Sequence, residues 1–145
     1  MDVEDTVRAY YEALRRGEPL SPFFVEGPDV VKFGISERLE GSEAVAEGLR
    51  AQTQTTDGWV VESSNLVAAD RGDHGWFSDE VFMAWTDRER SVRYEFDTRW
   101  SGTLVRVEGG KRGPGDESDG APAPDSAPGE WRFAGMHVST AREGL

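Results

Sequence analysis

Three long runs of strand-forming residues in the second half of the sequence restrict the fold more than any other feature. The runs are Trp76–Thr86, Tyr94–Val107 and Trp131–Thr140, and the first two are joined by the short turn cluster 87–90. Runs of this kind joined by hairpin connections predict antiparallel strands. The stretch Trp59–Ala69 predicts one more strand before them.

The first part of the chain predicts helices. Apolar residues recur at helical spacing over Val3–Leu14, acidic residues occupy the first turn, and Gly17 follows as a C-cap residue. Ser21–Val25 predicts a short second helix with proline at its first position, and residues 42–54 predict a third. Between them, Asp29–Ile35 predicts a short first strand.

Helices followed by antiparallel strands are typical of an α+β fold. The strand from Trp76 carries large apolar residues on both faces, with Trp76 and Phe82 on one face and Phe77 and Met83 on the other. A sheet that is buried on both faces needs two covering layers, and the few helices supply only one. We therefore expect a homodimer that pairs through the outer face of the sheet.

The segment 109–129 separates the last two strands. It is rich in proline and glycine and contains no large apolar residue. Such a segment buries too little apolar surface to offset the entropy of ordering its backbone. We expect residues 1–145 to form a single domain, with 109–129 as a flexible insertion in a hairpin.

Composition excludes several classes of partner. The 28 acidic and 16 basic residues give a net charge of −12, which opposes binding to nucleic acid or to an anionic membrane. No run is long and apolar enough to span a membrane, and the N-terminus lacks the features of a signal peptide. With no cysteine and two separated histidines, we expect no metal and no cofactor. We expect a cytoplasmic protein.

The basic residues are almost all arginine. Lys32 and Lys111 are the only lysines among the 16 basic residues. An excess of carboxylates with very little lysine suits a surface that works in concentrated salt, where ions screen the self-repulsion. We interpret the chain as halophilic.

Several stretches resemble the nuclear transport factor 2-like superfamily, especially its SnoaL-like members. Val7–Gly17 is similar to the opening helix of that family, Gly41–Val45 to the start of its third helix, and Trp131–Ser139 to its closing strand. The closing strand is also similar to that of calcium/calmodulin-dependent kinase association domains. The resemblance implies a cone-shaped, mostly antiparallel sheet wrapped around three N-terminal helices, with a pocket inside.

The superfamily includes isomerases, cyclases, hydrolases, dehydratases and oligomerisation hubs, so its fold does not decide function. We expect a domain that binds a small, mostly apolar organic molecule in the cone. An enzyme of the isomerase, cyclase or hydrolase type is compatible with this expectation, but no residue set establishes catalysis. The alternative is a non-catalytic interaction or oligomerisation module with a filled cone. Ketosteroid isomerase activity is rejected, because the base of those enzymes lies on the first strand, where this chain has Lys32 or Phe33.

Two polar residues on the last strands are candidates for the pocket. Arg99 would bind a carboxylate or enolate there. Alternatively, it belongs to an exposed ion-paired ladder with Arg93, Glu95 and Asp97. His137 would act as an acid or base, or make a structural hydrogen bond. Of Asp79 and Glu80, one is expected to face inward beside them.

Aromatic residues complete the predicted site. Tyr10 lies where ketosteroid isomerases carry a hydrogen-bonding tyrosine, although its helical stripe equally predicts a core residue. Trp76 and Trp100 are expected to line an aromatic wall. The predicted ligand-binding set, whose His137 and Glu80 are also the catalytic candidates, comprises Arg99, His137, Glu80, Tyr10, Trp76 and Trp100.

Overall fold

The structure, a computed structural model, describes residues 1–107, 131–142 and 144, so the expected insertion at 109–129 lies outside the described residues. The helical elements are α1 (Val3–Arg16), the 3₁₀ turn η1 (Ser21–Phe23) and α2 (Ser42–Thr55). Within the described ranges, none of the helices has the length and apolar character needed to cross a membrane.

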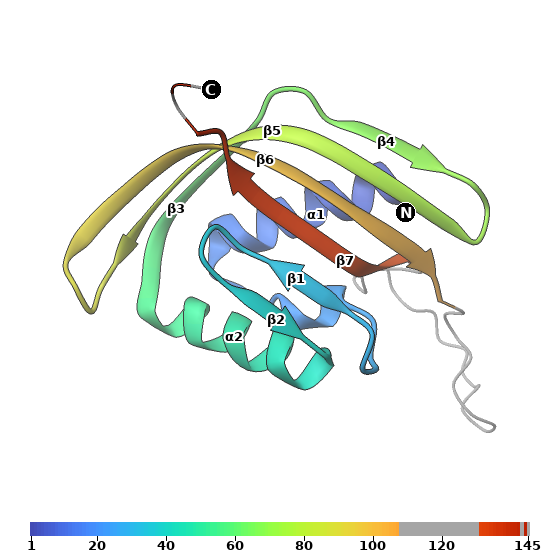
Figure 1. Ribbon diagram of the computed structural model, residues 1–145, viewed down its shortest axis with the longest axis horizontal. Helices are drawn as coiled ribbons and strands as arrows, with labels where there is room; N and C mark the ends of the chain where they lie inside the picture. The colour runs from blue at the N-terminus through green and yellow to red at the C-terminus, as the bar shows by residue number, and fades with distance from the viewer. Residues whose placement is uncertain (108–130, 143, 145) are drawn as a thin grey trace.

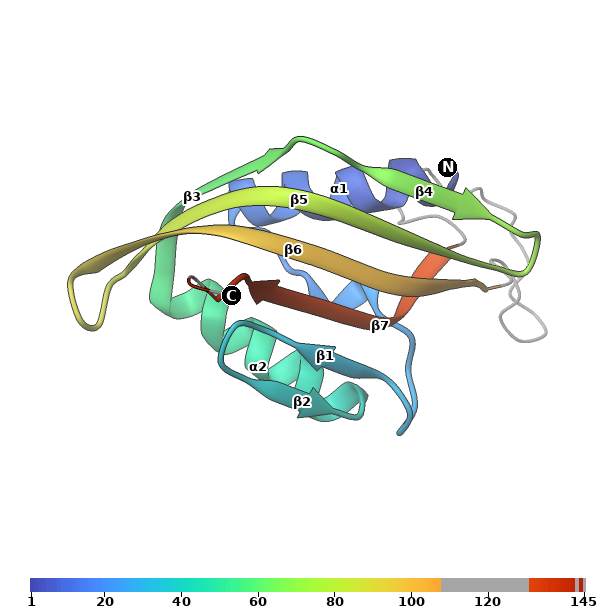
Figure 2. The same ribbon diagram turned by 45° about the horizontal axis from the view of Figure 1, so that its top comes forward.

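The strands form one curved sheet in the order β2-β1-β7-β6-β5-β3, and β4 pairs with β5 beside this path. All pairings are antiparallel except that of β1 with β7. Figures 1 and 2 show β5 and β6 arching over α1, with α2 and the β1–β2 hairpin on the open side of the arch. This is the expected α+β cone. The strands are β1 (Val31–Phe33), β2 (Arg38–Glu40), β3 (Thr56–Ser63), β4 (Val67–Asp70), β5 (His74–Asp87), β6 (Val92–Arg106) and β7 (Trp131–Thr140).

Helix α1 has well-defined ends. The Asp2 carboxylate accepts a hydrogen bond from the Asp5 backbone N–H at 2.8 Å, and the Asp5 carboxylate accepts one from the Asp2 N–H at 3.2 Å. This reciprocal capping satisfies two backbone donors that the first turn leaves free. At the other end, Gly17 adopts the left-handed conformation with φ 71° and caps the helix.

The apolar face of α1 packs into the concave side of the sheet. Tyr10 and Tyr11 are buried, and both rings contact Trp100 of β6 edge-on, at centroid distances of 6.1 and 5.3 Å. Tyr10 makes a similar contact with Phe133 of β7 at 5.3 Å. These rings bury large areas in geometries that aromatic pairs prefer, so they fix the helix against the sheet.

Three elements differ from the sequence-based expectation. The second helix is a single 3₁₀ turn at Ser21–Phe23, and the first strand is cut to three residues by the turn that leads into β2. The run Trp59–Ala69 is divided into β3 and β4. The division has a local cause: the Asn65 backbone N–H donates to the Asp79 carboxylate at 3.0 Å instead of to a neighbouring strand.

Asp79 is the buried carboxylate of β5, and Glu80 beside it is exposed. The Tyr11 hydroxyl donates to Asp79 Oδ2 at 2.7 Å, and the backbone N–H groups of Asn65 and Glu80 donate to Oδ1. Three donors therefore surround this carboxylate. Its role is structural, because it joins α1, β5 and the β3–β4 connection.

We predict that Tyr11→Phe lowers the free energy of unfolding by about 1.5–3 kcal/mol, because a buried carboxylate loses one of its donors. Urea unfolding would measure the change. Tyr94→Phe is the matched control, since the half-buried Tyr94 makes no side-chain hydrogen bond within the described residues, and it should change stability by less than about 0.5 kcal/mol. Equal effects of both variants would contradict the structural role of the Tyr11–Asp79 contact.

Candidate functional site

A cavity of about 180 Å³ lies between α1, the β1–β2 hairpin and the inner face of the sheet. Its walls are mainly aromatic and aliphatic: Tyr10, Leu14, Ile35, Trp59, Met83, Trp85, Trp100 and Val138. The cavity is also lined by three long polar side chains, those of Lys32, Glu37 and Gln52. A mostly apolar cavity with a few convergent polar groups is typical of small-molecule sites.

Lys32 and Glu37 form an ion pair at the cavity. Lys32 Nζ donates to Glu37 Oε2 at 2.7 Å, and the two side chains are 7% and 40% exposed. The tight turn after β1 brings them together, since the Gly34 N–H donates to the Glu37 carbonyl at 3.0 Å. A Cβ at Gly34 would stand 2.9 Å from Glu37 Cγ, so only glycine lets this side chain fold back.

The hydroxyl of Tyr10 has no hydrogen-bond partner within the described residues, although the side chain is only 2% exposed and lines the cavity. Burial, and to a lesser extent the charge of Glu37, raises the pKa of Tyr10 far above its usual value. The phenol therefore remains a neutral O–H donor under physiological conditions. A buried donor without an acceptor is uncommon in folded proteins and indicates a place where a ligand group or water binds.

Trp59 and Trp85 form a stacked pair on one wall, with ring centroids 4.8 Å apart. The indole N–H of Trp59 donates to Thr56 Oγ1 at 2.9 Å. The Thr56 hydroxyl in turn donates to the Gln52 carbonyl at 2.6 Å, which fixes the junction between α2 and β3.

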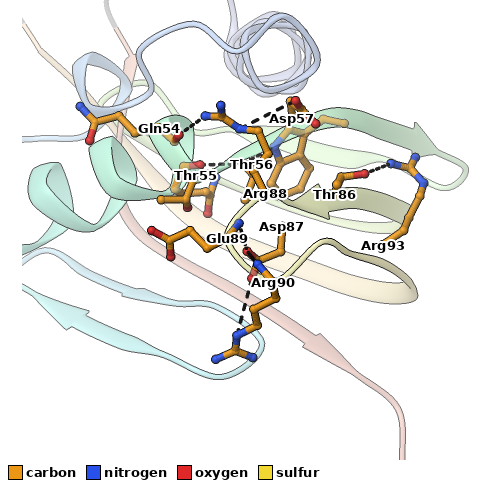
Figure 3. A network of polar contacts seen from close by, with 12 residues as sticks. Gln54, Thr55, Thr56, Asp57, Thr86, Asp87, Arg88, Glu89, Arg90 and Arg93 are labelled. Carbon is orange, nitrogen blue, oxygen red and sulfur yellow. Dashed lines mark hydrogen bonds and ion pairs between the residues drawn. The ribbon is translucent and has the colours of Figure 1, made fainter.

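Figure 3 shows how the β5–β6 turn is fastened to the same junction. The Arg88 side chain donates to the Gln54 carbonyl and lies 3.8 Å from the Asp57 carboxylate, and the Arg88 backbone N–H donates to the Thr55 carbonyl. Arg93 bridges Thr86 and the Gly58 carbonyl. These contacts join the turn to the α2–β3 junction, to which the Trp59 indole is also hydrogen-bonded.

The structure places two of the six predicted ligand-binding residues at the cavity. Tyr10 and Trp100 are both buried and line it. The Trp100 indole donates to Thr98 Oγ1 at 2.9 Å, so its polar edge is satisfied and it contributes an apolar ring face.

Arg99 and His137 lie on adjacent strands, but the expectation that they reach the cone interior is wrong. Trp100 pairs with Val138 in the β6–β7 register, and both are buried on the concave face. Because side chains alternate along a strand, the neighbouring Arg99 and His137 point outward, and both are exposed. The Arg99 guanidinium donates to the Thr140 carbonyl at 3.5 Å.

Glu80 and Trp76 also lie on the outer face. Glu80 is exposed and sits opposite Arg99 in the β5–β6 register. Trp76 is 44% exposed, and the Arg71 guanidinium lies 5.0 Å from its ring centroid. Neither residue takes part in the cavity.

The sequence analysis missed Glu37, Trp59 and Trp85, and it considered Lys32 only as a residue that cannot serve as an isomerase base. The signal at Lys32 was its rarity, because lysine is exceptional in this chain. No signal pointed to Glu37, which the short turn after β1 folds back onto Lys32. No group of three His, Asp or Glu side chains suited to a metal ion occurs in the part of the chain that the structure describes.

A curved sheet that encloses a helix and an aromatic cavity defines a nuclear transport factor 2-like fold. The family model for the SnoaL-like domain matches residues 3–111. The chain therefore belongs to the SnoaL-like domain family.

Solved structures share the fold at low sequence identity. A nuclear transport factor 2-like superfamily protein from Salmonella enterica is 14% identical, with a TM-score of 0.71 over 97% of this chain and 90% of the other. A candidate dehydratase of the same family from Streptomyces avermitilis is 15% identical, with a TM-score of 0.72 over 97% and 94%. A ketosteroid isomerase-like protein from Erwinia carotovora is 16% identical, with a TM-score of 0.67 over 97% and 94%. A search of curated proteins gives no significant match.

We predict opposite consequences for the two members of the cavity ion pair. Glu37→Gln should lower the free energy of unfolding by about 1–3 kcal/mol, because it leaves the buried Lys32 ammonium without a counter-charge. Lys32→Met should leave stability unchanged or raise it, since Glu37 can turn to solvent and an apolar side chain fills the same space.

Thermal unfolding of both variants would measure these changes. Glu40→Gln is the control, because the Arg38–Glu40 pair is more than half exposed on both sides and should contribute less than about 1 kcal/mol. If Glu37→Gln and Glu40→Gln behave alike, the Lys32–Glu37 contact is not the buried pair described.

Proposed function

We propose that the protein binds a small, mostly apolar organic molecule in the cavity between α1 and the sheet. The observation that carries this proposal is the Tyr10 hydroxyl, which is buried against the cavity and lacks a protein partner within the described residues. The alternative of an interaction module with a filled cone is less favoured, because about 180 Å³ remains open between the aromatic walls.

The size of the cavity limits the ligand. Sites for drug-sized molecules usually measure roughly 300–1,000 Å³, whereas an apolar cavity of roughly 150 Å³ binds benzene. A volume of about 180 Å³ therefore suits a molecule with one ring and a small substituent.

The polar groups limit the substituent. Tyr10 offers one O–H, and Lys32 has three N–H donors of which Glu37 accepts one. The unmet groups of Tyr10 and Lys32 are therefore donors, and the Gln52 amide on the same cavity can both donate and accept. An anionic ligand would also meet the Glu37 carboxylate, which already neutralises Lys32. These groups favour a neutral acceptor such as a ketone or aldehyde oxygen.

We extend the proposal to proton-transfer chemistry on this ligand. Glu37 is the carboxylate that lines the cavity, and Tyr10 is a neutral donor on the same cavity. A carboxylate base and a phenol donor on one carbonyl compound are the components of enolisation or dehydration. The name of one fold neighbour, a candidate dehydratase, agrees with this class of reaction.

We predict that acetophenone, a neutral one-ring ketone, binds one site per chain, whereas benzoate and ethylbenzene of similar size bind more weakly. Isothermal titration calorimetry would measure all three. Tyr10→Phe should weaken acetophenone binding about two- to tenfold, as expected for the loss of one hydrogen bond. Trp76→Phe, on the outer face, is the matched control and should have no effect. Absence of saturable binding, or a preference for benzoate, would contradict the proposal.

We also propose that the protein is a homodimer that pairs through the outer face of the sheet. Trp76 and Phe33 support this, because they remain 44% and 38% exposed, and large exposed apolar side chains on one face commonly mark interfaces. Light scattering in molar salt should give the dimer mass, and Trp76→Glu should shift it toward the monomer. A monomer mass for the unmodified chain at micromolar concentration would contradict the dimer proposal.

A further inference from the structure

Lysine use in this chain is selective. Fourteen of the 16 basic residues are arginine, and Lys32 is the lysine within the described residues. Every other described basic position outside histidine holds a guanidinium, which is always protonated and cannot act as a nucleophile. Among the described side chains, the primary amine therefore lies at the cavity, on the inner face of β1.

The surroundings of Lys32 differ from those of a surface lysine. Its side chain is 7% exposed, and Nζ has Glu37 Oε2 as its partner at 2.7 Å. The other N–H groups of the Lys32 ammonium have no acceptor within the described residues. Tyr10 lines the same cavity with a free hydroxyl, and the rings of Trp59, Trp85 and Trp100 form its walls.

We propose that Lys32 forms a reversible iminium, or Schiff base, with a small aldehyde or ketone bound in the cavity, and that Glu37 carries the proton. This inference rests on the proposed function, because the carbonyl compound must first enter the cavity. It adds a covalent step on a named atom and restricts the substrates to compounds with an unhindered carbonyl group.

Ligand entry supplies the free amine. The Glu37 side chain is 40% exposed while the cavity is open, and a bound ring shields it from water. Loss of water destabilises a charged pair relative to a neutral one. The proton then moves along the 2.7 Å hydrogen bond from Nζ to the Glu37 carboxylate and leaves a neutral amine beside a neutral acid.

The iminium forms in two steps, addition of the amine to the carbonyl group and loss of water. The Nζ lone pair attacks the carbonyl carbon, and the π electrons move to oxygen, where Tyr10 donates a hydrogen bond. A proton passes from nitrogen to oxygen and gives a neutral carbinolamine. Glu37 then protonates the hydroxyl, which leaves as water while the nitrogen lone pair forms the C=N bond. The products are an iminium cation, one water and the Glu37 carboxylate that pairs with the cation.

The aromatic walls suit this product. The charge of an iminium spreads over nitrogen and carbon and is weakly hydrated, and such cations are stabilised by nearby indole faces. No oxidant or reductant is consumed. Water reverses the step, so the adduct persists only as an equilibrium species unless it is reduced.

Reductive trapping tests the inference. The full chain is incubated with limiting benzaldehyde and sodium cyanoborohydride, digested, and the lysine-containing peptides are quantified by mass spectrometry. Lys111, which lies outside the described residues, and Nα-acetyl-lysine in the same tube give the unselective rate. We expect Lys32 to be labelled at least about tenfold faster than either, as a positioned amine should be.

Variants separate the chemistry from folding. Lys32→Arg keeps the charge and should abolish the fast label, because a guanidinium forms no Schiff base. Glu37→Gln should slow labelling of Lys32 about tenfold or more, because the proton carrier is lost, and Glu40→Gln should not. Far-ultraviolet circular dichroism confirms that each variant is folded.

Two results overturn the inference, and they differ in what they say of the proposed function. If acetophenone binds in the calorimeter but Lys32 is labelled no faster than Lys111, the covalent step is wrong and the binding site stands. If neither binding nor selective labelling occurs, the proposed function falls together with the inference.

Discussion

The contact between the tyrosine pair of α1 and the concave face of the sheet is the interaction on which the structure depends. Tyr10 and Tyr11 both pack edge-on against Trp100, and Tyr11 also reaches the buried Asp79 carboxylate. The long strands β5 and β6 bury their concave face by curving around α1 (Figure 2). Side chains alternate along each strand, and those on the concave side face α1. The contact with α1 therefore also decides which side chains can reach a ligand.

The buried polar groups on the inner side of the sheet are of two kinds. The Asp79 carboxylate accepts three hydrogen bonds and is not among the residues that line the cavity, so it stabilises the fold. Lys32 and Tyr10 retain donors that no described protein atom accepts. Ligand binding and chemistry are expected where hydrogen bonding is incomplete. We therefore assign function to the cavity wall that carries Lys32 and Tyr10, and a structural role to Asp79.

Sequence reasoning predicted the elements of this fold better than its inner surface. Capping residues, helical spacing and turn clusters predicted α1, α2 and the long hairpin, because these signals are local. The prediction that Arg99 and His137 face the cone interior was wrong. Both faces of the long strands carry large residues, so the sequence pattern does not show which face packs against α1. Glu37 was missed because a three-residue strand and a tight turn, which no periodicity reveals, fold it onto Lys32.

A crystal structure of the protein with acetophenone would show which face of the sheet holds the ligand. We predict that the ring lies between Trp59, Trp85 and Trp100, with the carbonyl oxygen within hydrogen-bond distance of the Tyr10 hydroxyl and the carbonyl carbon facing Lys32 Nζ. A ligand seated on the outer face beside Arg99 and His137, or a cavity closed by its own tryptophans, would contradict it.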